Sequence, residues 1–118
     1  MKTFTAENFS PKEFVDYIME INKLGESNPL LKNKIEKEIF RTLNDRILVT
    51  ILGAMTEEDM AVYQLIRKAH SELTEFGALL AVLDEIPALN EFMLKGINDL
   101  AEELTKDVQG LRDALNQK

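Results

Sequence analysis

The feature that most constrains this chain is the spacing of its hydrophobic residues, which recur every three or four positions over long stretches. An α-helix has about 3.6 residues per turn, so this spacing places the hydrophobic side chains on one helical face. The longest such stripe, in the stretch 87–116, consists of Leu89, Met93, Ile97, Leu100, Leu104, Val108, Leu111 and Leu115. A second stripe between Pro29 and about Leu52 consists of Leu31, Ile35, Ile39, Leu43, Ile47 and Ile51. The pattern predicts amphipathic helices.

Residues that start or end helices divide these stripes. Ser, Asn and Thr accept hydrogen bonds from the free N–H groups of a first helical turn, and Pro is well tolerated there. Such start signals are Ser10-Pro11, Asn28-Pro29, Thr56-Glu57 and Ile86-Pro87. Gly25 and Gly53 are expected to end the first two helices, and Gly77 is expected to break or kink the third. The fourth helix is expected over 78–83, and its separation from the third stays open.

These segments predict the fold class. We expect a compact all-α bundle of four to five helices with a long C-terminal amphipathic helix. The 118 residues suit one domain, 1–118, with residues 1–9 as an N-terminal arm and residues 105–118 as a helix end that projects.

Charge predicts which helices are neighbours. Residues 29–53 contain five basic and three acidic residues, whereas residues 77–118 contain four basic and eight acidic residues. The opposite local charges favour packing of the second helix beside the last one. Gly96 and Gly110 interrupt the last helix, and each marks either a close approach of another backbone or a tolerated glycine.

Composition excludes several classes of function. The net charge of −7 argues against nucleic acid and against an anionic membrane surface as partners. The longest uncharged run, Ile47 to Thr56, is about half of what a membrane span needs. The chain has no Cys, and its first residues lack the apolar region of a secretory signal. A cytoplasmic protein is therefore expected.

The sequence predicts no catalytic residue, no cofactor and no metal site. His70 is the single His, and the Glu-x-x-His motif of di-iron bundles is absent. No glycine-rich phosphate loop occurs, and no nucleophile motif surrounds any Ser. A weak site formed by His70 with Glu72 or Thr74 across an oligomer interface is the remaining option. We therefore expect that the chain is not an enzyme.

What remains is binding to other proteins. The residues expected at a partner interface are hydrophobic residues of the last and second helices: Val108, Leu111, Leu115, Leu104, Leu48 and Leu52. The alternative is that the first or second helix of the same chain covers the end of the last helix. The predicted function is a helical protein–protein interaction module, an adaptor, scaffold or assembly factor, that forms a homo-oligomer, most simply a dimer. Alternatives are an acidic inhibitor that occupies a basic groove and a metal-assisted enzyme.

Three segments also carry a family resemblance. They are Leu43-Asn44-Asp45-Arg46-Ile47-Leu48, Met55-Thr56-Glu57-Glu58-Asp59 and Ile86-Pro87-Ala88-Leu89. The region from Leu43 to Leu104 resembles a family of short helical bacterial domains of unknown function, in which Asn usually stands where this chain has Ala88. The resemblance implies a bacterial or bacteria-associated origin and a helical interaction domain, and it implies no activity.

Overall fold

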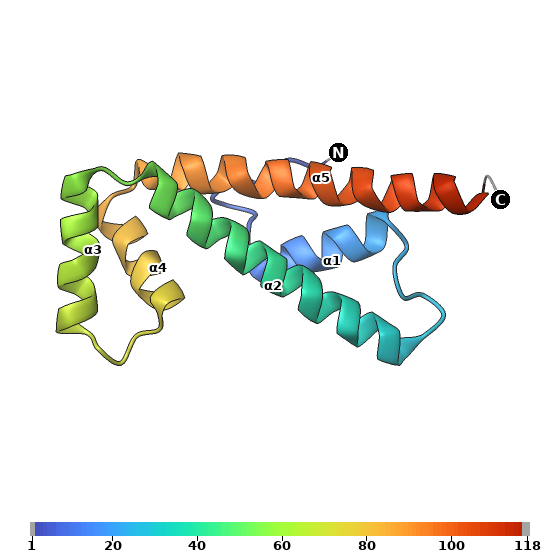
Figure 1. Cartoon of the computed structure of the whole chain (residues 1–118), viewed down its shortest axis with the longest axis horizontal. Helices are drawn as coiled ribbons and strands as arrows, with labels where there is room; N and C mark the ends of the chain where they lie inside the picture. The colour runs from blue at the N-terminus through green and yellow to red at the C-terminus, as the bar shows by residue number, and fades with distance from the viewer. Residues whose placement is uncertain (1, 117–118) are drawn as a thin grey trace.

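The computed structural model describes the backbone of residues 2–116 and the side chains of residues 2–110. The described residues form five helices and no strand, which confirms the predicted all-α class (Figure 1). The helices are α1 (Pro11–Ile21), α2 (Pro29–Ala54), α3 (Glu57–Ala69), α4 (Glu75–Glu85) and α5 (Leu89–Asn116). The bundle is elongated, with extents of 54 × 26 × 25 Å.

The two long helices α2 and α5 form the central pair. They run in opposite directions and pack against each other more extensively than any other two helices, which confirms the pairing predicted from charge. α1 packs against both helices. α3 and α4 form a hairpin at one end, and α4 also contacts α2. Towards the other end, the start of α2 and the end of α5 diverge (Figure 1).

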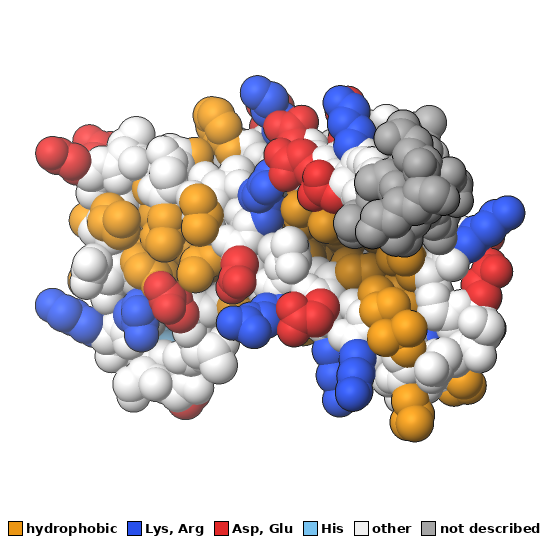
Figure 2. Space-filling model, turned by 45° about the vertical axis from the view of Figure 1, so that its right-hand side comes forward, with side chains coloured by type: hydrophobic (Ala, Val, Ile, Leu, Met, Phe, Trp, Pro, Cys, Tyr) orange, Lys and Arg blue, Asp and Glu red, His pale blue; other side chains and the backbone are white. Residues whose placement is uncertain are grey.

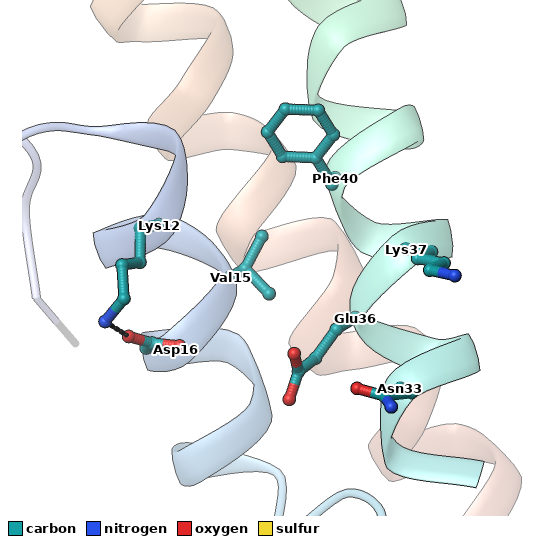
Figure 3. A pocket seen from close by; sticks show the side chains of 7 residues that line it. All are labelled: Lys12, Val15, Asp16, Asn33, Glu36, Lys37 and Phe40. Carbon is teal, nitrogen blue, oxygen red and sulfur yellow. Dashed lines mark hydrogen bonds and ion pairs between the residues drawn. The ribbon is translucent and has the colours of Figure 1, made fainter. Parts of the chain in front are cut away.

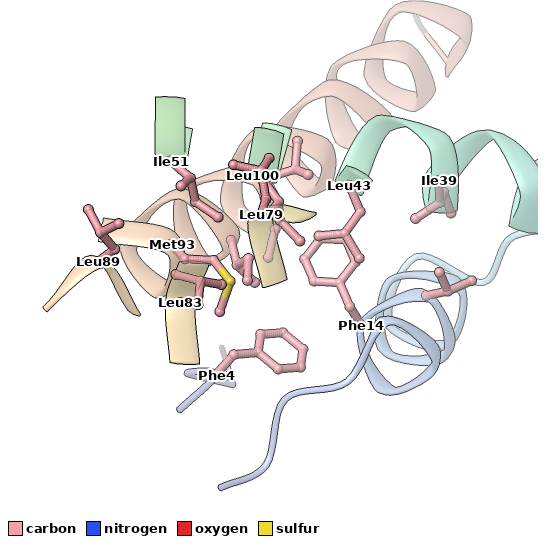
Figure 4. Packing of buried hydrophobic residues seen from close by; sticks show 14 of the residues in the cluster. Phe4, Phe14, Ile39, Leu43, Ile51, Leu79, Leu83, Leu89, Met93 and Leu100 are labelled. Carbon is pink, nitrogen blue, oxygen red and sulfur yellow. The ribbon is translucent and has the colours of Figure 1, made fainter. Parts of the chain in front are cut away.

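The core lies where four helices and the N-terminal segment meet. Most of the buried side chains come from α1, α2, α4 and α5, with Tyr63 added from α3, and Figure 4 shows part of this cluster around Phe4 and Phe14. The predicted stripes of α2 and α5 supply much of this core: Ile39, Leu43, Ile47, Ile51, Leu89, Met93, Ile97 and Leu100 are all buried. Leu31, at the start of the α2 stripe, is 47% exposed. The stripe of α2 is therefore covered only from its second turn onward.

Phe4 joins the N-terminal segment to the core. Its side chain is 1% exposed and contacts the rings of Phe9, Phe14 and Tyr17 at centroid distances of 6.0, 5.5 and 5.6 Å. The Phe4 N–H donates to Asn98 Oδ1 over 2.7 Å, and Asn98 Nδ2 donates to the Phe4 carbonyl over 3.0 Å. These paired hydrogen bonds attach the segment to α5. The sequence pattern did not reveal this role of Phe4.

Gly96 allows a close approach between α2 and α5. A Cβ atom added at Gly96 would lie 2.7 Å from Thr50 Oγ1 and 3.1 Å from Thr50 Cγ2. A Cβ atom added at Gly110 would meet no described atom within 4 Å. Of the two readings of these glycines, close approach therefore applies to Gly96, where the neighbour is a side chain, and tolerance applies to Gly110.

The capping residues in the sequence predicted the starts of helices more accurately than the glycines predicted their ends. Ser10, Asn28 and Thr56 each accept a hydrogen bond from the N–H three residues later, as predicted. Gly53, however, lies inside the last turn of α2 and does not end it. Gly77 neither breaks nor kinks α3, because α3 ends at Ala69 and Gly77 lies in the first turn of α4. The side chain of Thr74, which accepts from the Gly77 N–H over 3.0 Å, starts α4 and separates the two helices.

The end of α1 also differs from the prediction. Gly25 is left-handed, with φ of 69°, but α1 already ends at Ile21. Lys23, with φ of 51°, occupies the left-handed position after the cap residue Asn22. The Lys23 N–H donates to the carbonyl of Glu20 and the Leu24 N–H to that of Met19, which together form a Schellman motif. A residue with a Cβ atom is strained in this conformation.

We predict that Lys23→Gly stabilises the protein by about 1 kcal/mol, because glycine adopts a left-handed conformation without a steric penalty. Chemical denaturation measures the change. Lys23→Ala is the matched control, since it removes the same side chain and keeps the strain. Equal stability of the two variants would contradict the assignment.

The contact at Gly96 generates a second stability prediction. Gly96→Ala should destabilise the protein by about 1–2 kcal/mol, because the stiff, β-branched Thr50 side chain must move. Gly110→Ala should instead stabilise it by about 0.5–1 kcal/mol through helix propensity alone. Thermal unfolding of both variants tests the pair, and stabilisation by both would show that α2 and α5 are not in tight contact at Thr50.

Candidate functional site

The single histidine lies in an exposed turn. His70 Nδ1 is 3.2 Å from Glu72 Oε1, and both side chains are mostly exposed to solvent. Within the side chains that the structure describes, no three His, Asp or Glu residues are grouped so that they could hold a metal ion. The interaction surfaces predicted from the sequence are located through the hydrophobic residues near the surface.

The residues predicted to form a partner interface fall into three sets. Leu104 and Val108 lie half-buried on the second half of α5. Leu48 and Leu52 lie half-buried on the second half of α2, where they pack against the core. Leu111 and Leu115 belong to α5 by their backbone, but their side chains lie outside the described residues. The structure thus separates Leu48 and Leu52 from the end of α5.

Leu104 instead faces the first half of α2, across a groove between the diverging helices. We call this surface the end groove. It has a volume of about 270 Å³ and is lined by Lys34, Ile35, Glu38, Ile39, Thr42 and Leu104. Figure 2 shows hydrophobic side chains emerging beside the grey C-terminal residues, towards the end of the molecule that holds the start of α2.

Helical spacing extends the end groove in one direction. Leu31 precedes Ile35 by four residues and Val108 follows Leu104 by four, so each continues the hydrophobic face of its own helix. Because α2 and α5 are antiparallel, both extensions lead towards the same open end of the bundle. Leu31 and Val108 are therefore the next hydrophobic residues of the two helices beyond the groove, and we call Leu31, Ile35, Leu104 and Val108 together the hydrophobic strip.

An ion pair joins α2 and α5 near the groove, at positions close in sequence to its lining. Arg46 on α2 donates through both terminal nitrogens to the carboxylate of Glu103 on α5, with Nη1 3.2 Å from Oε1. This hydrogen bonding to Arg46 lowers the pKa of Glu103 below its ordinary value. A two-pronged Arg–carboxylate pair is geometrically specific, so it fixes the register of the two helices at this level.

A second hollow lies between α1 and α2. It has a volume of about 390 Å³, and Figure 3 shows the side chains of Val15 and Phe40 between the two helices with charged side chains around them. Lys12 and Asp16 form an ion pair of 3.0 Å within α1. Val15 and Phe40 supply the hydrophobic lining of this hollow, and lysine and carboxylate side chains place both signs of charge at its rim.

Comparison with known proteins adds no family. A scan against protein-family models and searches of curated proteins and of solved structures found no match. The resemblance to a bacterial domain family stays a prediction. In the described part of the chain, no helix combines the length and the hydrophobicity that crossing a membrane requires.

The Arg46–Glu103 pair generates a prediction about pH. Because the pKa of Glu103 is lowered in the folded protein, the pair stabilises the fold above the unfolded-state pKa of about 4.3. This contribution disappears as the pH falls through the lower folded-state pKa. Urea unfolding should therefore show that Glu103→Gln is less stable than the native protein at neutral pH, with a difference that shrinks in acid.

The background variant Arg46→Met supplies the control for this experiment. Without the guanidinium, Glu103→Gln should change stability by the same small amount at neutral and acid pH. A difference that is independent of pH in the native background would contradict the role assigned to the pair.

Proposed function

We propose that this chain is a non-catalytic helical protein–protein interaction module that self-associates through the end groove. The observation that carries the proposal is the hydrophobic strip of Leu31, Ile35, Leu104 and Val108, which runs to the open end between α2 and α5. Extended hydrophobic strips on protein surfaces commonly mark interaction sites. A cytoplasmic location belongs to this proposal.

Helix geometry favours another helix as the occupant of the strip. The strip has a wall from each of two long helices, and a groove of this kind accepts the hydrophobic face of a helix. α5 itself carries such a face, because its hydrophobic positions continue in sequence as Leu111 and Leu115. A second copy of this chain therefore offers a matching element.

Charge supports a symmetric pairing. Residues 32–41 of α2 contain four basic and two acidic residues, whereas residues 99–107 of α5 contain four acidic and one basic residue. In a twofold dimer, the α2 of each copy faces the α5 of the other, so both contacts join opposite charges. In this twofold arrangement the end groove of each copy is occupied by the other copy, so the assembly stops at a dimer.

We predict that the native chain sediments with twice its mass of 13.5 kDa. Leu31→Glu should shift it to a single chain, because association would bury an unpaired carboxylate against the hydrophobic strip. Analytical ultracentrifugation over a range of concentrations measures both masses. Circular dichroism should show unchanged helicity, since Leu31 is half-exposed within one chain.

Leu30→Glu is the matched control. Leu30 is the neighbouring residue and is 77% exposed, but it lies about 100° away around α2 and so outside the strip. This variant should keep the native mass. A native chain that sediments as a monomer throughout, or a loss of association in both variants alike, would contradict the proposal.

A further inference from the structure

Another hydrophobic hollow, distinct from the end groove and from the hollow between α1 and α2, lies at the other end of the bundle, where the α3–α4 hairpin meets the remaining helices. We call it the α4 hollow. It has a volume of about 360 Å³, and its hydrophobic lining includes Phe76, Leu80 and Leu83 of α4, Met93 of α5 and Phe9 of the N-terminal segment. Leu80 is 44% exposed, so the hydrophobic surface reaches out of the hollow to solvent.

The hydrophobic residues that α4 contributes to the hollow form an extended row. Phe76, Leu80 and Leu83 are four and three residues apart, which places them along one face over about two helical turns. The other hydrophobic lining residues include Phe9 of the N-terminal segment, Pro11 at the start of α1 and Met93 of α5. A hollow bounded along its length by a helix face suits an elongated occupant that presents two or three hydrophobic side chains.

Three polar side chains also line the α4 hollow. Ser10 caps α1, and its hydroxyl hydrogen is free to donate. Within the described part of the chain, the side chains of Asp84 and Asn90 make no hydrogen bond or ion pair. The anionic carboxylate of Asp84 therefore lies exposed to solvent at the edge of a hydrophobic hollow, where no other described side chain pairs with it.

The surrounding sequence carries only negative charge. No Lys or Arg occurs between Lys68 and Lys95, whereas five acidic residues do: Glu72, Glu75, Asp84, Glu85 and Glu91. The stretch spans all of α4 and the start of α5, the two helices that supply most of the lining. An occupant with basic groups beside its hydrophobic face would match this surface in charge.

From this shape and this charge we infer that the α4 hollow binds a basic amphipathic helix of another protein. Hydrophobic side chains spaced three or four residues apart occupy the hollow along Phe76, Leu80 and Leu83, and a Lys or Arg of the same helix pairs with Asp84. The end groove carries charges of both signs, so the two surfaces have different partners. A chain that pairs with its own copy at one end and binds a basic helix at the other acts as an adaptor.

Binding of synthetic helical peptides tests this inference. The probe is a fluorescent Leu/Lys amphipathic peptide of about 18 residues, long enough to form a helix, together with its Leu/Glu counterpart. The full chain should bind the Leu/Lys peptide and not the Leu/Glu peptide. Amide chemical shifts in NMR spectra should change around Phe76, Leu80 and Asn90.

Matched variants separate specific docking from general attraction to an acidic protein. Leu80→Ser should raise the Kd for the Leu/Lys peptide about tenfold, whereas Leu65→Ser, at a 67% exposed position on α3, should leave it unchanged. Asp84→Asn should weaken binding more than Asp45→Asn, which removes an exposed charge on α2. Equal effects within each pair, or shift changes centred on Ile35 and Leu104, would overturn the inference.

The same variants distinguish this site from self-association. Leu80→Ser should keep the sedimenting mass of the native chain, whatever that mass is. A change of mass in Leu80→Ser would show that a second copy occupies the α4 hollow and would overturn the inference. Loss of self-association in Leu31→Glu with peptide binding retained would show that the two surfaces act separately.

Discussion

The contact between Thr50 and Gly96 is the constraint on which the arrangement of this protein depends. It brings α2 and α5 together at one level, and the Arg46–Glu103 pair holds them a short distance further along. Towards the start of α2 and the end of α5 the two helices diverge (Figure 1). Straight helices that cross closely at one point must separate on the far side, so the tight contact itself produces the open end groove.

The N-terminal segment fixes the arrangement of the helices at the centre of the bundle. Phe4 fills the space among α1, α4 and α5 that helices alone leave open, and Asn98 holds its backbone. The same segment continues through Phe9, which forms one wall of the α4 hollow. The packing that completes the core therefore also shapes the α4 hollow. Both the end groove and the α4 hollow arise because the five helices that the structure describes are too few to cover all of the hydrophobic faces of this chain.

Several elements could be predicted from sequence because their causes are local. The caps Ser10, Asn28 and Thr56 act on the backbone three residues away, and the stripes of α2 and α5 follow from helical spacing. Thr74 is an equally local cap, but the prediction placed the helix boundary at Gly77 instead.

Other features depend on contacts between distant residues. The insertion of Phe4 brings it into contact with Asn98, which is 94 residues away in the sequence. No spacing rule reveals such a contact. The predicted interface grouped Leu104 and Val108 with Leu48 and Leu52, which lie on the second half of α2 and do not line the end groove.

Amide hydrogen exchange at low and high protein concentration tests the central claim most directly, because it reports on each helix of the native chain without substitution. If a second copy covers the strip between the diverging helices, the amides of Ile35 and Val108 will exchange more slowly at high concentration, while those of α3 will not change. Exchange at Ile35 and Val108 that is the same at both concentrations would show that the strip stays uncovered.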